Sequence, residues 1–250
     1  DDDGLDVDAG RRAAPDARLA YAAPSHQFPL GVTMGLARRL ALLEWARQRG
    51  AWVVEDDYDS EFRYAGRPLP ALQGLDADRR VVYVGTFSKT LFPSLRLGYA
   101  VVPDDLVDAF ARAHVLSDYL APTLDQAVAA DFLAGGHFAR HVRRMRALYR
   151  ERQAALLAAL DERLRGAVRA GPAAAGMHLV AWLPPGADDR AASRAALDAG
   201  VEAPPLSIYC RERPRPSALL LGYAATPAEE IPRAVERLAA ALEGAGALRG

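Results

Sequence analysis

Three apolar runs constrain the fold of this chain most: AWVVEDDYD (51–59), VVYVGTFS (81–88) and LGYAVVP (97–103). Each run is continuously apolar over several residues, without the alternation typical of a strand that has one solvated face. Helical patterns or long loops separate such runs, and this order is typical of a largely parallel sheet buried on both faces. We therefore predict an α/β fold with flanking helices and a further buried strand in LAYAAP (19–24).

Apolar spacing predicts a helix over 32–49, with Val32, Leu36, Leu40 and Leu43 on its buried face and Gly50 as its stop. Three more helices follow at 104–114, 122–133 and 138–164, the first capped by Asp104. After residue 164 the predicted strands and helices alternate again. We predict strands in GMHLVAWLP, GVEAPP and ALLLGYA and helices over 189–199 and 227–242. Residues 1–160 would form a large domain and residues 161–250 a smaller C-terminal α/β domain.

Composition excludes several classes of protein. Hydrophobic content of 51%, charged content of 25% and a net charge of −1 are typical of a globular domain and not of a dedicated nucleic-acid module. The single cysteine, Cys210, excludes an internal disulfide and favours a reducing, cytoplasmic compartment. No apolar run reaches the length of a membrane span, and we predict no metal site.

Lys89 is the only lysine among the 31 Lys and Arg residues of the chain. A coding bias explains why lysine is rare, but it does not explain which lysine remains. Arginine replaces lysine as a surface cation, but it cannot replace an amine that must lose its proton, as in a Schiff base to a carbonyl cofactor. Lys89 alone leaves chance and catalysis equally open, so its neighbours must decide.

Polar groups follow two of the predicted strands where each strand ends. In a sheet of this type ligands lie at the carboxyl ends of the strands, which brings the acids of EDDYD and the TFSK segment to one rim. Pyridoxal phosphate (PLP) needs an amine for its aldehyde, an anion at its pyridine nitrogen, a donor to its phenolic oxygen and a phosphate cradle. These needs are met in order by Lys89, Asp56, Tyr58 and the group Thr86, Ser88 and Arg96.

EDDYDSEFRY and GTFSKTLFPSLRLGY together resemble the fold-type I PLP-dependent enzymes of the class I/II aminotransferase group. PSHQFPLG (24–31) and GHFARHVRRMRALYRER (136–152) narrow the resemblance to the aminotransferase-like domain of the MocR regulators, a branch of the GntR family. The resemblance implies that Lys89 is the Schiff-base lysine, that Asp56 pairs with the pyridine nitrogen and that Tyr58 bonds the phenolic oxygen. It further implies a homodimer.

The segment PSHQFPLG is where related aminotransferases carry an N-P-T-G turn whose Asn touches the phenolic oxygen. Phe28 stands at the Asn position here, so that contact is missing. His26 and Gln27 are weaker candidates for lining the cofactor site, and His26 is equally well explained as a turn histidine bonded to backbone. SDYLAPTLDQ (117–126) could reach the site or a partner, although a helix connection is the simpler interpretation.

By the same resemblance, the front of the large domain and the winged helix-turn-helix that binds DNA would lie upstream of this chain. Aminotransferases of this fold usually hold the substrate carboxylate with an arginine on a late strand, yet SALLLGYA has none. Arg211, Arg213 and Arg215 precede that strand and could reach in. The prediction is therefore an effector-sensing PLP domain that binds an amine or amino acid. The alternatives are an active aminotransferase, of the 2-aminoadipate or aromatic type, and a decayed fragment.

Overall fold

The computed structural model describes residues 1–67, 70–118, 122–211 and 216–248. These residues form two compact units. Unit 1 comprises residues 1–28, 32–61 and 66–143, and unit 2 comprises residues 29–31, 62–65 and 144–250. The division falls inside the long helix α6 (His137–Leu164), in which the predicted domain boundary near residue 160 also lies. Each unit is described by itself.

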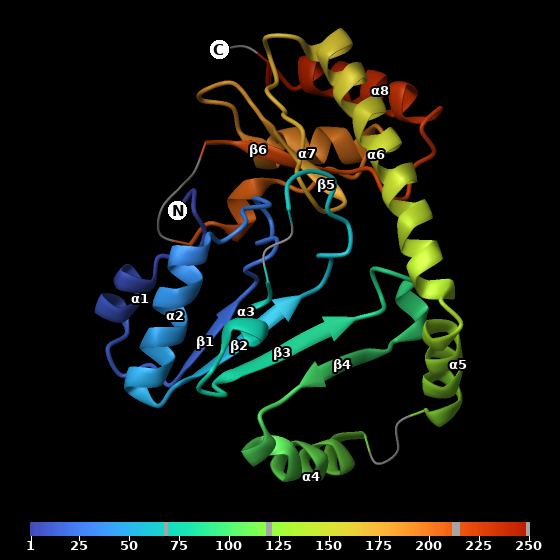
Figure 1. The fold of residues 1–250 in the computed structure, drawn as a ribbon. Helices are drawn as coiled ribbons and strands as arrows, with labels where there is room; N and C mark the ends of the chain where they lie inside the picture. Colours follow the sequence, from blue (N-terminus) through green and yellow to red (C-terminus); the bar gives the residue numbers. More distant parts are fainter. Residues whose placement is uncertain (68–69, 119–121, 212–215, 249–250) are drawn as a thin grey trace. The chain divides into compact units, whose positions relative to one another are not determined.

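Unit 1 contains a four-stranded sheet in the order β1 (Leu19–Ala22), β2 (Trp52–Asp57), β3 (Val81–Thr86) and β4 (Gly98–Val101) (Figure 1). The first three strands are parallel, and β4 runs antiparallel to β3. Helix α2 (Leu36–Arg49) connects β1 to β2, and α3 (Leu72–Leu75) lies before β3. The prediction of an α/β fold with a largely parallel sheet is confirmed.

The core of unit 1 covers one face of this sheet. Val53 and Val81 are almost fully buried there against Leu42 and Trp45 of α2, Leu72 of α3 and Val7 of α1 (Val7–Ala13). The opposite face is far more open, with Leu19 56% and Tyr21 64% exposed. The expectation that every strand is buried on both faces is therefore wrong for β1, and also for β4, whose four residues are all exposed.

Helix α2 differs from its prediction in its start and in its buried face. It begins at Leu36 because residues 24–34 form a turn, in which Gln27 N donates to Val32 O and Met34 N to Pro24 O. The predicted apolar face is wrong, since Leu36 and Leu40 are about half exposed. The buried side chains are those of Arg39, Leu42, Trp45 and Ala46. Gly50 ends the helix in the left-handed conformation, as predicted.

The remaining helices of unit 1 were predicted with small errors, while α1 and α3 were missed. A 3₁₀ turn (Asp104–Leu106) precedes α4 (Val107–Asp118), and α5 spans Thr123–Ala134. Asp104 is not a cap, because its carboxylate pairs with Arg79 instead. Tyr119, in the segment considered for reaching the site, lies outside the described residues.

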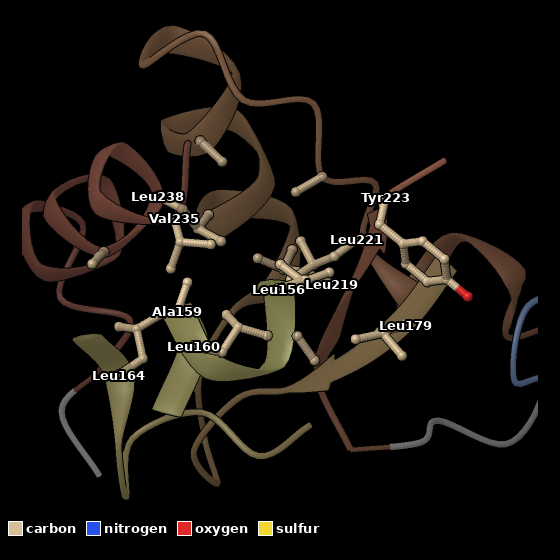
Figure 2. Packing of buried hydrophobic residues seen from close by; sticks show 14 of the residues in the cluster. Leu156, Ala159, Leu160, Leu164, Leu179, Leu219, Leu221, Tyr223, Val235 and Leu238 are labelled. Carbon is tan, nitrogen blue, oxygen red and sulfur yellow. The ribbon is translucent and has the colours of Figure 1, made fainter. Parts of the chain in front are cut away.

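Unit 2 packs helices against a two-stranded antiparallel sheet of β5 (His178–Trp182) and β6 (Ala218–Gly222). Figure 2 shows its core, in which Leu156 and Leu160 of α6 meet Val235 and Leu238 of α8 (Ile231–Gly244) and Leu221 of β6. Helix α7 (Asp189–Asp198) is capped by Asp188, and a 3₁₀ turn (Leu206–Tyr209) follows it. The strand predicted in GVEAPP is wrong, since only an isolated bridge from Pro205 to Leu219 forms there.

Helix α8 begins at Ile231, later than predicted, because residues 228–230 form a turn before it. Among the described residues, no helix has both the length and the apolar character needed to cross a membrane.

Candidate cofactor site

The register of the sheet brings the predicted acid and phosphate-binding residues together. Asp56 of β2 pairs with Val84 of β3, and Thr86 lies two residues farther along the same strand. Paired residues of neighbouring strands point to the same face, and side chains on one strand alternate between faces. The side chains of Asp56 and Thr86 therefore lie on one face of the sheet, at the carboxyl ends of their strands.

Lys89 lies in the loop that joins β3 to β4, and this loop is held at several points. Its ends are tied by Phe87 N, which donates to Leu97 O at 3.0 Å. Thr90 is buried, and its carbonyl accepts from His141 Nε2 of α6 at 2.9 Å. Lys89 itself is exposed, and in the described part of the chain its amine makes no hydrogen bond or ion pair. The contacts of its neighbours therefore hold the loop in place, while the Lys89 amine stays available to bind a ligand.

The phosphate-binding candidates surround the same loop. Thr86 Oγ1 accepts from Ser88 N at 3.1 Å, which turns the chain at the end of β3. Arg96 ends a 3₁₀ turn (Pro93–Leu95) with φ 50°, a left-handed conformation rare for any residue but glycine. Because Phe87 N bonds Leu97 O, Arg96 lies across the loop from Ser88. The guanidinium of Arg96 is exposed and has no ion-pair partner within the described ranges.

Asp56 has a partner that the sequence did not indicate. The hydroxyl of Tyr21, on the neighbouring strand β1, donates a hydrogen bond to Asp56 Oδ2. This bond, with the negative charge of Asp56, raises the pKa of Tyr21 to about 12. Tyr21 therefore remains a donor at neutral pH and holds the carboxylate on the open face of the sheet.

Tyr58 and His26 come together with a residue that was not predicted, Asp59. His26 Nδ1 lies 2.9 Å from Asp59 Oδ2 and 3.1 Å from the hydroxyl oxygen of Tyr58. His26 and Asp59 are almost fully buried. Burial, followed by the charges of Asp59, Asp56 and Asp57, raises the pKa of Tyr58, so its phenol stays protonated at neutral pH. Tyr58 and a histidine two residues before the expected Asn position were the sequence signals for this cluster, and nothing in the sequence indicated Asp59.

Two tyrosines pack on the other face of the sheet, at the same end of β2 and β3. Tyr83 donates to Asp57 Oδ2 at 2.8 Å, and the ring of Tyr99 lies over Gly85. A Cβ at Gly85 would clash with the ring of Tyr99, so this position accepts only glycine without rearrangement. These contacts fix the backbone from which Thr86 and the Lys89 loop begin.

Other predicted residues lie elsewhere. Gln27 is exposed, and its Oε1 lies close to Gly4, so the structure gives its side chain no contact with the Lys89 loop. Phe28 is 46% exposed. Arg211 is exposed, and Arg213 and Arg215 lie outside the described residues.

The chemistry of the gathered side chains fits PLP. One rim of unit 1 offers a primary amine and a guanidinium without partners in the described structure, a carboxylate, a protonated phenol and two hydroxyls. A carbonyl cofactor with a pyridine ring and a phosphate requires this set.

Comparison with known proteins agrees with this geometry. The family described as aminotransferase class I and II matches residues 14–238. The chain is 43% identical, over 98% of its length and 50% of the other protein, to the probable rhizopine catabolism regulatory protein MocR of Rhizobium meliloti. It is also similar to a crystal structure of LysN, an α-aminoadipate aminotransferase of Thermus thermophilus complexed with N-(5′-phosphopyridoxyl)-L-leucine. For LysN the TM-score is 0.87 and the identity 32%, over 99% of this chain and 65% of that one.

A kynurenine aminotransferase of Pyrococcus horikoshii, in complex with PMP, gives a TM-score of 0.86 at 30% identity, over 98% of this chain and 62% of that one. The chain therefore belongs to the class I and II aminotransferase family, and its fold is that of fold-type I. It spans about half the length of the curated regulators that it matches.

Proposed function

We propose that this chain is the PLP-binding, effector-sensing domain of a MocR-type regulator of the GntR family. The observation that carries the proposal is the placement of the sole lysine, without a partner among the described residues, beside Thr86, Ser88 and Arg96 at a rim shared with Asp56. The family match and the phosphopyridoxyl ligand of LysN support PLP as the cofactor.

Each side chain has a task that its chemistry suits. Lys89 Nζ would bond covalently to the aldehyde carbon, and Asp56, held by Tyr21, would keep a proton on the pyridine nitrogen. Tyr58 would donate to the phenolic oxygen. Thr86 and Ser88 would offer hydroxyl donors to the phosphate, and Arg96 would neutralise its charge. PLP, when bound, supplies an electron sink for a bound amine.

A sensing role is supported by the similarity to MocR and by the residues of β6. Strand β6 (Ala218–Gly222) carries alanine, three leucines and glycine, and its side chains before Gly222 are buried. It therefore lacks the arginine with which aminotransferases of this fold orient a substrate carboxylate. An amine that binds without efficient turnover can still shift a conformational equilibrium. We propose that this shift acts on a DNA-binding domain outside the chain, in a homodimer.

The alternative function is a working aminotransferase. The likeness to LysN, at a TM-score of 0.87 and 32% identity, favours it specifically. Multiple turnover of an amino acid with 2-oxoglutarate by the full-length protein would decide for the enzyme and against the sensor. The sensor predicts at most one slow turnover and a change in operator affinity when PLP or an amine is added.

The cofactor assignment is tested by borohydride reduction of the PLP-loaded full-length protein. We expect a visible absorption band that borohydride removes and a phosphopyridoxyl group on Lys89, found by peptide mass. Lys89→Arg is the matched variant, because it keeps the positive charge but cannot form the bond. A reduced adduct of equal yield in Lys89→Arg would show that the assignment is wrong.

A further inference from the structure

The contacts around His26 indicate whether its ring nitrogen Nδ1 carries a hydrogen. Nδ1 lies 3.1 and 2.9 Å from the two carboxylate oxygens of Asp59, and it lies 3.1 Å from the hydroxyl oxygen of Tyr58. A carboxylate has only acceptors, so these short contacts are favourable when Nδ1 carries the hydrogen and donates it. The exposed fractions of the His26 and Asp59 side chains are both 2%, so water does not compete for this bond.

A hydrogen on Nδ1 determines which group donates in the contact between His26 and Tyr58. The ring nitrogen then has no lone pair to offer, so Tyr58 cannot donate to it. The tyrosine oxygen can only accept a share of the Nδ1 hydrogen, and its own O–H must point to another acceptor. If Nδ1 were unprotonated instead, Tyr58 would donate to His26 and its hydrogen would not be available to a ligand.

We propose that Asp59 and His26 are positioning residues that aim the hydroxyl hydrogen of Tyr58 at the phenolic oxygen of PLP. This inference rests on the proposed function, and it extends it to two residues that do not touch the cofactor's reacting atoms themselves. The inference also gives a physical reason for His26. Because Phe28 occupies the Asn position, Tyr58 would be the donor to the phenolic oxygen. Its hydrogen must therefore not be given to His26 Nδ1 instead.

The charges around Tyr58 agree with a fixed donor. Burial is the main cause of the raised pKa of Tyr58, and the charges of Asp59, Asp56, Asp57 and Tyr21 raise it further, so the phenol stays protonated. Replacing Asp59 by asparagine keeps the shape but adds an N–H donor. That donor would bond to Nδ1 as an acceptor and reverse the hydrogen bonds of the cluster.

The first test is the ring of His26 in the full-length protein without PLP. Proton–nitrogen NMR of the histidine side chains, assigned with His26→Gln, should show a hydrogen on Nδ1 of His26 in the wild type and none in Asp59→Asn. An unprotonated Nδ1 in the wild type would overturn the inference, whether or not PLP binds.

The second test is the pH midpoint at which the visible absorption of PLP-loaded protein changes. A donor to the phenolic oxygen stabilises negative charge there, so its loss should raise the midpoint by about 1 pH unit. We expect this shift in Tyr58→Phe and in Asp59→Asn, and no further shift when the two are combined. Asp189→Asn, a buried aspartate of unit 2 that accepts from Ser207 N, is the matched control and should leave the midpoint unchanged.

The outcomes separate this inference from the cofactor assignment. If Lys89→Arg abolishes borohydride trapping but Asp59→Asn leaves the midpoint unchanged, PLP binds as proposed and the positioning role is wrong. If Asp59→Asn shifts the midpoint equally in the Tyr58→Phe background, Asp59 does not act through Tyr58, and the inference is also wrong. If the wild type binds no PLP, both proposals are wrong.

Discussion

Replacing Arg39 by methionine should destabilise unit 1 strongly. Arg39 is fully buried in α2, and its guanidinium donates to three backbone carbonyls. The acceptors are Met34 O at 2.9 Å, Pro70 O at 2.9 Å and Pro24 O at 2.8 Å. These carbonyls belong to the turn that carries His26 and to the loop before α3. One side chain thus fixes two loops against the core.

The magnitude follows from the groups left without partners. The bonds to Met34 O and Pro24 O are buried, and each buried carbonyl without its donor costs about 1–3 kcal/mol. Pro70 is exposed, so its carbonyl adds less. Methionine fills much of the volume, and some carbonyls can rebond to water, so the full sum will not be reached. The charge of Arg39 also favours the ionised form of the buried Glu55 carboxyl. We expect the free energy of unfolding of unit 1 to fall by about 4 kcal/mol.

Glu55 makes this loss depend on pH. Its carboxylate accepts from Leu72 N at 2.8 Å and Gln73 N at 2.9 Å, and burial raises its pKa. A raised folded pKa means that the stability contributed by this group is lost as the pH rises through that value. Without Arg39 the charged form is disfavoured further. The deficit of Arg39→Met should therefore shrink as the pH is lowered from 7 toward 5.

Hydrogen exchange measured by mass spectrometry can follow each unit separately in the full-length protein. Peptides from β2 and β3 report unit 1, and peptides from β5 and β6 serve as an internal reference. Arg38→Met is the matched control, because Arg38 is the preceding residue but forms a partly exposed ion pair with Asp1, worth about 0–1 kcal/mol. A loss below about 1 kcal/mol in Arg39→Met, or a loss equal to that of the control, would refute the reasoning.

Three further predictions concern the rim. Gly85→Ala should lower the free energy of unfolding of unit 1 by about 1–3 kcal/mol, because the Cβ of the alanine would meet the ring of Tyr99. Adding Tyr99→Ala should recover part of that loss. Arg96→Gly should weaken PLP binding, measured by spectral titration, without lowering stability, since glycine suits φ 50°; a fall in the melting temperature would contradict this. Tyr21→Phe should remove one phenol that titrates near pH 12 in ultraviolet difference spectra, and an unchanged titration would show that Tyr21 does not bond Asp56.

The strands and most helices of this chain could be predicted because their signals are local. Continuous apolar runs located β2 and β3, and Gly50 located the end of α2. The start and the buried face of α2 could not be predicted in this way. Val32 fits a helical period, but it is held in a turn by Gln27, and a charged residue, Arg39, occupies the center of the buried face. An arginine whose guanidinium bonds backbone carbonyls 15 and 31 residues away leaves no mark in a hydrophobic pattern.

The candidate site also contains residues that could be predicted and residues that could not. Lys89, Asp56 and Tyr58 were predicted because each offers a chemical group that PLP needs, and such groups stand out in a chain with one lysine. Tyr21 and Asp59 were missed because they act on other side chains, and their partners lie 35 and 33 residues away in sequence. Only the register of β1 with β2 and the path of the turn before α2 bring these groups together.

The residues proposed to touch the cofactor would be constrained by its chemistry, whereas Tyr21, Asp59 and His26 would be constrained only by the hydrogen bonds that they make. If Asp59 and His26 aim the O–H of Tyr58 as proposed, a variant of Asp59 would keep every group that PLP requires and still alter the acidity of the bound cofactor. In a domain that responds to an amine, the supporting residues would then set how readily the site responds while those that touch the cofactor set what it binds.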